Sequence, residues 1–416
     1  MTQITNDHEA RARDLPLSEF DVGDPALFRE DGAWQPYFAR LRREDPVHYC
    51  AQSRFGPYWS VTKYKDIMAV DVDHARFSSE SDLGGITIID RPIEFRRQNF
   101  LSMDPPRHDE QRKAIQPIVA PPNLANFEGI IRERTCEVLD GLPRDKVFNW
   151  VDLVSIELTS RMLATLFDFP IEDRRKLTYW SDVATTDIAS GGPIDSEEKR
   201  DIELAECVTY FRRLWDERAS APPRPDLISM LAHNPATQNL TPAEFLGTLS
   251  LLIVGGNDTT RNSMSAGVRF LHENPDEFRK LRENPDLVES MVPEIIRFHT
   301  PLAHMRRTAT VDTELGGKTI KKGDKVVMWY ISGNRDADSI EDPDRFIIDR
   351  KRPRQHLSFG FGIHRCVGNR LAEMQLKILW IEILKRFERI EVVAPPKKIY
   401  SSFVHGISDL EVRIQA

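Results

Sequence analysis

The sequence predicts a single, mostly α-helical domain with a minor β part. Between about residues 105 and 300, apolar residues recur every three or four positions, which is typical of amphipathic helices. Strand-like segments are few and do not alternate with helices as a βαβ protein requires. The chain has 416 residues. A chain of this length can bury about 75% of its unfolded surface in one unit. We therefore expect one domain over residues 1–416, with a flexible N-terminus over about residues 1–20.

The predicted elements run from a short strand to a long central helix. A strand rich in aromatic and β-branched residues is expected at 58–63. Helices are expected at 127–139, 153–167 and 202–214, separated by joints that contain proline and glycine. The longest helix is predicted over 241–273, after a Thr-Pro-Ala-Glu start that suits a capping box. A helix of this length would be roughly 50 Å long, enough to cross the domain.

The remaining elements lie in the last third of the chain. A helix is predicted at 287–298, although Pro293 removes one of its hydrogen bonds. A strand follows a Gly-Asp turn at 325–331, and an amphipathic helix occupies 369–387. A last strand is predicted at 410–414.

Composition and charge exclude several classes of protein. The 57 basic residues against 65 acidic ones give a formal net charge of −8, which offers no basic footprint for nucleic acid. No apolar stretch approaches the 18 or so residues of a membrane span. The N-terminal residues are polar and mixed in charge, so we expect no secretory signal and a cytoplasmic location.

The four cysteines are widely spaced and form no Cys-x-x-Cys pair, which excludes the usual zinc and iron–sulfur spacings. We expect Cys50, Cys136 and Cys207 to be buried, inert thiols. Cys366 differs, because it lies in a loop over 359–368 that contains three glycines and immediately precedes a predicted helix. Glycines let a backbone approach a flat ligand, and amides at a helix N-terminus favour a thiolate. This loop suits an axial ligand to haem iron.

Four further motifs precede this loop. With these motifs, which occur in the order typical of the family, the sequence resembles the cytochrome P450 family of haem-thiolate monooxygenases over roughly residues 103–403. The motifs, in chain order, are Asp104-Pro105-Pro106 with His108 and Arg112, then Gly255-Gly256-Asn257-Asp258-Thr259-Thr260, Glu294-x-x-Arg297, Asp344-Arg345-Phe346 and the Cys366 loop.

The resemblance implies a cytochrome P450 fold around haem b, iron protoporphyrin IX. Cys366 would be the axial thiolate and thus the metal ligand. The family positions that hold the haem propionates are matched by His108, Arg112, Arg307 and His364. Glu294, Arg297 and Arg345 resemble a structural salt-bridge triad behind the haem loop.

Asp258 and Thr259 resemble the acid–alcohol pair of the oxygen-activating helix and are the expected catalytic residues. A hydroxyl can hold a water beside dioxygen, the co-substrate, while a neighbouring carboxylate relays protons from solvent. Gly255 and Gly256 weaken the helix there and would open a groove for dioxygen.

The family places several mostly apolar residues beside the substrate, so a hydrophobic substrate is expected. These residues are Leu251, Val254, Gly255, Leu302, Ala303, Phe403 and Val404. His304 next to them could contact substrate, a propionate or neither. The stretch from Val292 to Arg307 and the Gly-Gly-Asn-Asp-Thr-Thr helix look like the soluble bacterial group that hydroxylates alkanes and fatty acids at the chain end.

Two alternatives remain open. Related bacterial groups that oxidise sterols or terpenoids carry a similar helix. A non-catalytic haem-thiolate binding or sensor protein is a different class, but it would not need the intact Asp258–Thr259 pair.

We also expect separate redox partners, because the chain ends soon after the haem loop. The resemblance implies electrons from NAD(P)H through a flavin-dependent reductase and a ferredoxin, of the [2Fe–2S] type. Basic residues around the Cys366 loop would steer an acidic partner, namely Arg350, Lys351, Arg352, Arg354, Arg365 and Arg370. Nothing indicates an oligomer, so a monomer is expected.

Overall fold

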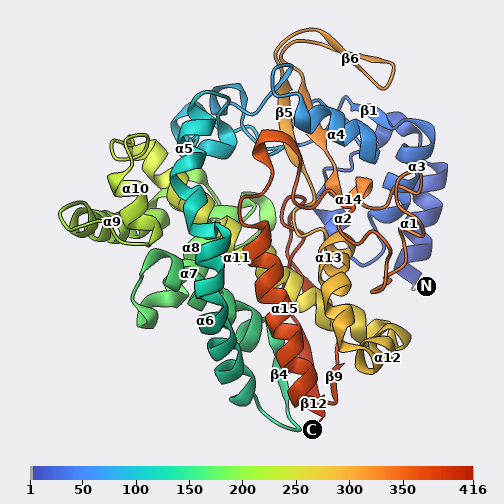
Figure 1. Ribbon diagram of the computed structural model, residues 1–416. Coiled ribbons are helices and arrows are strands. Elements are labelled where there is room, and N and C mark those ends of the chain that lie inside the picture. Colours follow the sequence, from blue (N-terminus) through green and yellow to red (C-terminus); the bar gives the residue numbers. More distant parts are fainter. Residues whose placement is uncertain (1–2, 416) are drawn as a thin grey trace.

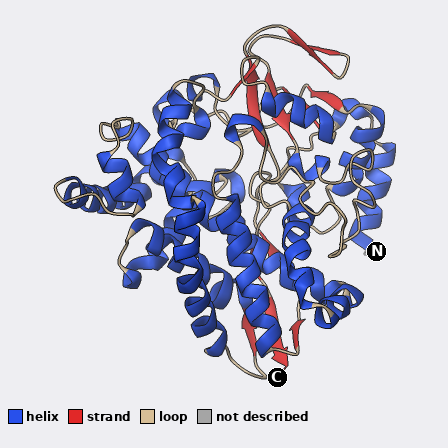
Figure 2. Cartoon of the chain, viewed as in Figure 1, coloured by secondary structure: helices blue, strands red, loops and turns tan. Residues whose placement is uncertain are grey.

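The computed structural model describes residues 3–415. Helices form most of the molecule, and strands gather in two separate places (Figure 2). The helices are α1 Gln3–Asp14, α2 Ala26–Arg29, α3 Gln35–Glu44, α4 Tyr64–Val72, α5 Arg107–Ile115, α6 Pro121–Asp140, α7 Glu157–Phe167, α8 Arg174–Thr185, α9 Glu197–Ala219, α10 Leu227–His233, α11 Pro242–Glu273, α12 Pro275–Glu283, α13 Val288–His299, α14 Tyr330–Gly333 and α15 Asn369–Arg386. This confirms the mostly α prediction.

The main sheet has the strand order β1-β2-β8-β5-β3, in which only β2 and β8 run parallel. A second sheet, β4-β12-β9, lies near the C-terminus, and β6-β7 and β10-β11 form two-stranded ribbons (Figure 1). The strands are β1 Val47–Cys50, β2 Tyr58–Val61, β3 Phe77–Ser78, β4 Val147–Asn149, β5 Met305–Ala309, β6 Thr313–Leu315, β7 Lys318–Ile320, β8 Lys325–Met328, β9 Arg389–Val392, β10 Lys397–Lys398, β11 Ile407–Asp409 and β12 Glu411–Gln415.

Helix α11 runs through the middle of the molecule and packs against α7, α8 and α15, and α6 lies on α15 (Figure 1). The predicted capping box is present: the Thr241 hydroxyl accepts the Glu244 N–H, and the Glu244 carboxylate accepts the Thr241 N–H at 3.0 Å. The helix stays continuous through Gly255 and Gly256. A Cβ at Gly256 would lie 2.7 Å from Leu163, so this glycine permits close packing against α7, whereas a Cβ at Gly255 would meet open space.

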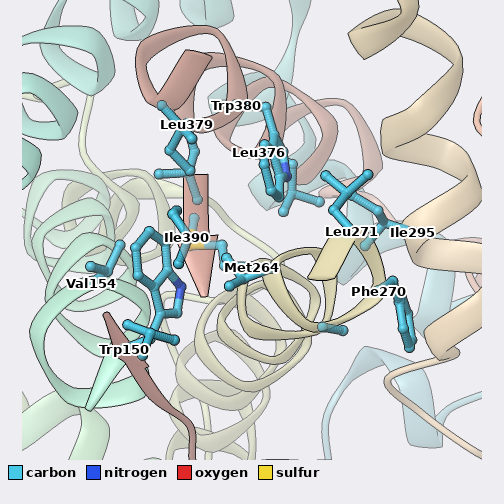
Figure 3. Packing of buried hydrophobic residues seen from close by; sticks show 14 of the residues in the cluster. Trp150, Val154, Met264, Phe270, Leu271, Ile295, Leu376, Leu379, Trp380 and Ile390 are labelled. Atoms are coloured by element: carbon cyan, nitrogen blue, oxygen red, sulfur yellow. The ribbon is translucent and has the colours of Figure 1, made fainter. Parts of the chain in front are cut away.

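A large apolar core surrounds the C-terminal half of α11. Figure 3 shows Met264 and Leu271 of this helix packed among Trp150, Ile295 and Trp380, which come from other elements. All five side chains are buried. This packing fixes α13 and α15 relative to α11, and α15 directly follows the Cys366 loop in the sequence.

Most predicted elements are confirmed, with two local differences. The strand expected at 325–331 ends at Met328, because Trp329 turns inward, donates to the Ser60 hydroxyl at 3.2 Å and is followed by α14. The helix expected at 153–167 begins with a π-helical turn, Val151–Ile156, before α7. Tertiary packing overrides local propensity at both places.

Part of the N-terminal segment packs onto the rest of the domain. Arg40 of α3 donates to the backbone carbonyls of Ala12, Arg13 and Leu15 at 2.7–3.0 Å and so caps the end of α1. Ala12 and Phe20 are buried in an apolar cluster. The flexibility expected for residues 1–20 stays a prediction. Within residues 3–415, no helix is both long and apolar enough to cross a membrane.

Candidate functional site

A cavity of about 390 Å³, here called the central cavity, lies between α11 and the Cys366 loop. Residues of α11 that line it recur every three or four positions from Gly247 to Ser263, so one face of the helix forms a wall. The opposite end of the lining includes Cys366, Gly368 and Leu371. The cavity therefore joins the predicted oxygen-activating helix to the predicted axial ligand.

The Cys366 loop turns tightly around Asp71 of α4. Gly360 and Gly362 have φ of 65° and 64°, a region that favours glycine. A Cβ at Gly362 would lie 2.6 Å from the Asp71 carbonyl oxygen. The Cys366 N–H donates to the Phe359 carbonyl at 2.8 Å and closes the loop. The glycines are thus required by the backbone conformation as well as by close approach.

The Cys366 side chain opens into the central cavity. Burial raises the pKa of its thiol, while the N–H groups of Gly368 and Asn369 at the start of α15, together with Arg112 and Arg365, act in the opposite direction. A metal cation at the sulfur would complete the deprotonation. Among the described residues, no group of three or more His, Cys, Asp or Glu is placed to hold a metal ion.

The four predicted propionate partners gather at one side of this sulfur. Arg112, Arg307 and His364 line the cavity, and His108 lies behind them with its ring 4.5 Å from that of His364. Burial, followed by these cationic neighbours, lowers the pKa of His364 to about 2. His108 Nε2, Arg112 Nη1 and His364 Nδ1 are buried without a partner among the described residues.

These unpaired groups fit a haem. Buried donors are normally paired, and a cation-rich cluster suits two carboxylates. Together with one thiol and an apolar cavity, the residues match an iron porphyrin whose propionates reach the cluster.

Asp71 is a site residue that no motif of the sequence pointed to. Its carboxylate accepts hydrogen bonds from Arg307 at 2.8 Å, Tyr330 at 2.9 Å and the Phe361 N–H at 2.7 Å. It thereby ties one propionate partner to the Cys366 loop. Asp71 lies far from every recognised motif in the sequence, so only the tertiary contact reveals it.

The structural triad contains a different arginine from the one expected. Glu294 and Arg297 form a fully buried pair, with Nε–Oε2 at 2.7 Å. The Arg345 side chain is 71% exposed and faces Asp342, so its assignment to the triad is wrong. Arg350 takes this place with Nε 3.1 Å from Glu294 Oε2. Only the backbone carbonyl of Arg345 takes part, because the turn after Pro343 directs its side chain outward.

The triad reaches the Cys366 loop through Asn334. Arg297 donates to the Asn334 carbonyl at 2.8 Å. The Asn334 side chain in turn accepts the Leu357 N–H and donates to the Ser358 hydroxyl at the start of the loop.

Asp258 and Thr259 are neighbours on α11 but face different surroundings. Thr259 lines the cavity, and its hydroxyl donates to the Gly255 carbonyl at 3.1 Å. Asp258 is fully buried against α8, where it accepts hydrogen bonds from Ser181 and Thr185 and pairs with Arg261 at 3.1 Å. Thr185 also lines the cavity, so the acid reaches it through α8.

Five of the seven predicted substrate contacts line the central cavity, namely Leu251, Val254, Gly255, Leu302 and Phe403. Ala303 and Val404 do not, and the prediction is wrong for these two. Both are buried and join their segments: the Ala303 N–H donates to the Phe403 carbonyl at 2.9 Å, and Val404 pairs with Leu302. The extended backbone alternates its side chains, which directs Leu302 toward the cavity and Ala303 away from it.

His304 contacts neither the cavity nor the propionate cluster. Its Nδ1 lies 2.8 Å from the Ser402 carbonyl, and its Nε2 accepts the Ile88 N–H at 3.2 Å. Burial lowers its pKa to about 4, so the ring is neutral. It connects two segments that border the cavity.

The predicted basic surface loses one member, because Arg350 is buried in the triad. The remaining residues are exposed around the loop, namely Lys351, Arg352, Arg354, Arg365 and Arg370. Arg354 is partly neutralised by Glu373 at 2.8 Å.

Comparisons of the sequence and of the structure with known proteins agree on one family. The family model "Cytochrome P450" matches residues 198–412. The chain is similar to linalool 8-monooxygenase of Pseudomonas putida, at 36% identity over 94% of this chain and 98% of that protein. Among solved structures, CYP153D17 from Sphingomonas sp. PAMC 26605 superposes with a TM-score of 0.91 at 48% identity, covering 96% and 100% of the two chains. Cytochrome P450-153 from Novosphingobium aromaticivorans gives 0.89 at 46%, covering 95% and 99%.

Proposed function

The chain belongs to the cytochrome P450 family and is a monooxygenase, and from this premise we propose that it hydroxylates the terminal carbon of a linear aliphatic chain, an alkane or a fatty acid. The observation that carries this proposal is the mostly apolar lining of the central cavity, which follows α11 over several turns. Lining residues of α11 extend from Gly247 to Ser263, about 24 Å of helix at 1.5 Å per residue. A long, apolar cavity suits a straight chain that enters end-on.

The apolar side chains that line the cavity support the same proposal. Leu251, Val254 and Leu302 add aliphatic surface, and Phe403 adds an aromatic ring. These side chains offer a terminal methyl group no hydrogen-bonding partner, so only shape and burial hold it there. The motif stretch from Val292 to Arg307 resembles the bacterial terminal hydroxylases, which agrees with this surface.

Haem bound to Cys366, with its propionates on Arg112, Arg307, His364 and His108, would supply the activation of dioxygen. The protein's own part is to hold the site rigid and to move protons. The Asp71 and Asn334 contacts fix the Cys366 loop on both flanks. The apolar wall keeps bulk water from the chain tip.

Proton delivery is assigned to residues of α8 and α11. Asp182 of α8 is half-exposed and bonds Arg261 at 2.5 Å. Arg261 pairs with Asp258, which accepts from the cavity-lining Thr185 at 3.2 Å. Arg261 stays protonated, so it orients the two carboxylates and passes no proton itself. Asp258 reaches the cavity through the Thr185 hydroxyl, and Thr259 presents a second hydroxyl there. We assign Asp258 to proton supply and Thr259 to holding the water that receives the proton.

Reducing equivalents would come from a [2Fe–2S] ferredoxin served by a flavin-dependent reductase. The exposed cations Lys351, Arg352, Arg365 and Arg370 around the Cys366 loop suit an acidic surface.

The test is product analysis with the reconstituted holoenzyme, ferredoxin, reductase, NADH and dioxygen. Dodecane and dodecanoate should give 1-dodecanol and 12-hydroxydodecanoate. In Thr259→Ala, electron consumption should continue while product per electron falls about tenfold or more. Hydroxylated linalool with straight chains left untouched would contradict the proposal.

The second candidate is a terpenoid or sterol hydroxylase. The 36% identity to a protein named for linalool favours it. Linalool and a sterol therefore belong in the same substrate series.

A further inference from the structure

The lining of the central cavity contains further cations besides Arg112 and Arg307, namely Arg91, Arg96 and Arg97 on the segment that follows β3. Arg200 of α9 is buried beside Arg91, because Glu197 Oε1 pairs with both of them. Burial lowers the pKa of Arg91 to about 10, and the charges of Arg200 and Arg97 act in the same direction. We call Arg91, Arg97 and Arg200 the arginine cluster.

The arginine cluster is only partly neutralised. Glu197 of α9 pairs with Arg200 and, at 3.3 Å, with Arg91. Asp201, one turn along α9, pairs with Arg97 at 2.5 Å. Within the arginine cluster, three guanidinium groups thus share two carboxylates, and Arg96, which also lines the cavity, donates only to backbone carbonyls among the described residues. An excess buried cation attracts an anion strongly.

Arg97 has the spare donor for such an anion. Its side chain is only 8% exposed, and its single side-chain partner among the described residues is Asp201. Its Nε–H is buried without a partner. A buried donor that is left unpaired costs free energy, and Arg97 lines the cavity, so a ligand that brings an acceptor to this side chain would relieve that cost.

We propose that the arginine cluster, through Arg97, binds the carboxylate of a fatty acid whose chain extends along α11 toward Cys366. This inference rests on the proposed function and narrows its substrate class from alkane or fatty acid to fatty acid. An alkane would leave the excess cation and the spare donor of Arg97 without a partner.

The place where the Arg97 segment meets α11 also indicates the length of the fatty-acid chain that fits. Its carbonyl carbon would lie 3.0 Å from a Cβ at Gly247, so the segment rests on the first turns of α11. Twelve residues separate Gly247 from Thr259, about 18 Å at 1.5 Å per residue. An extended hydrocarbon advances about 1.25 Å per bond, from a C–C length of about 1.5 Å at a near-tetrahedral angle. The span corresponds to a chain of about 14 carbons.

The experiment compares a charged and a neutral ligand of equal length. Dissociation constants of the holoenzyme for dodecanoate and 1-dodecanol are measured by calorimetry in the wild type and three variants. Arg97→Gln should weaken dodecanoate about tenfold or more and change 1-dodecanol less than about twofold. Asp201→Asn removes the competing carboxylate and should tighten dodecanoate about threefold. Arg175→Gln, whose residue pairs with Asp152 and Glu157 and is absent from the cavity lining, should change neither constant.

Each contrary result has a distinct meaning. If Arg97→Gln leaves dodecanoate binding unchanged, or weakens both ligands equally, the carboxylate site is overturned while the hydroxylation of aliphatic chains stands. If neither ligand binds the wild type but linalool does, the proposed function itself fails. Haem content and 1-dodecanol binding show whether Arg97→Gln is folded.

Discussion

Two groups of arginines and carboxylates serve the same site in different ways. In the triad, Glu294 accepts from Arg297, Arg350 and the Ile347 N–H, and Arg297 also donates to backbone carbonyls. In the arginine cluster, Arg97 Nε and Glu197 Oε2 are buried without a partner among the described residues. A buried network that is fully paired holds a shape, whereas a partly paired one retains the capacity to bind.

Breaking the fully paired group should have the largest effect. Glu294→Ala leaves Arg297 as an uncompensated charge in a fully buried site. We expect a loss of about 3–5 kcal/mol in the free energy of unfolding, and loss of haem, because the loop contacts through Asn334 depend on Arg297. Urea unfolding and haem content measure both. A loss below about 1 kcal/mol would show that the triad is not a structural support.

Arg350 and Arg345, the observed and the expected third member of the triad, give a matched pair of variants. Arg350→Ala should cost about 2–3 kcal/mol, since its guanidinium bonds Glu294 and is 9% exposed. Arg345→Ala should cost less than about 0.5 kcal/mol, because its side chain is exposed and paired only with Asp342. Equal costs in urea unfolding would contradict the assignment of Arg350.

His304 is a fully paired group whose contribution to stability should depend on pH, because its ring is fully buried and fully hydrogen-bonded. In the folded protein burial lowers the pKa of His304 to about 4, whereas an unfolded histidine has a pKa of about 6.5. As the pH falls below about 6.5, the unfolded chain therefore binds a proton that the folded chain does not bind, and the folded state loses stability. Its contribution is complete above about pH 6.5 and is lost progressively down to about pH 4. Between about pH 7.5 and 5 the loss is about 2 kcal/mol.

The measurement is the change in unfolding free energy between about pH 7.5 and 5, which should be about 2 kcal/mol smaller in His304→Gln than in the wild type. The other histidines contribute equally to both proteins and cancel. An identical pH dependence would mean that His304 is not neutral in the folded state.

Exposed charges should give the smallest effect. The cations around the Cys366 loop lie in solvent, where salt screens them. Raising the salt concentration from about 50 to 300 mM should slow reduction by an acidic ferredoxin about three- to tenfold. Stopped-flow reduction measures this, and Arg352→Gln should flatten the dependence. A rate that does not change with salt would exclude electrostatic steering.

The sequence by itself determined the elements and the local chemistry. The spacing of apolar residues predicted α6, α9, α11 and α15, and the capping box at Thr241 marked where α11 begins. The Cys366 loop could be recognised because glycines, thiol and helix start are adjacent in the chain. Such features depend on neighbours within a few residues, so a single sequence carries them.

Only the tertiary structure decided which distant residues complete the site. Asp71 reaches Arg307 across 236 positions, and Arg97 meets Asp201 across 104. The choice of Arg350 over Arg345, and of Leu302 over Ala303, depends on the direction in which each side chain leaves its backbone. Composition cannot express that direction, because it follows from how α11, α13 and the extended segments pack, and packing is a property of the whole folded chain.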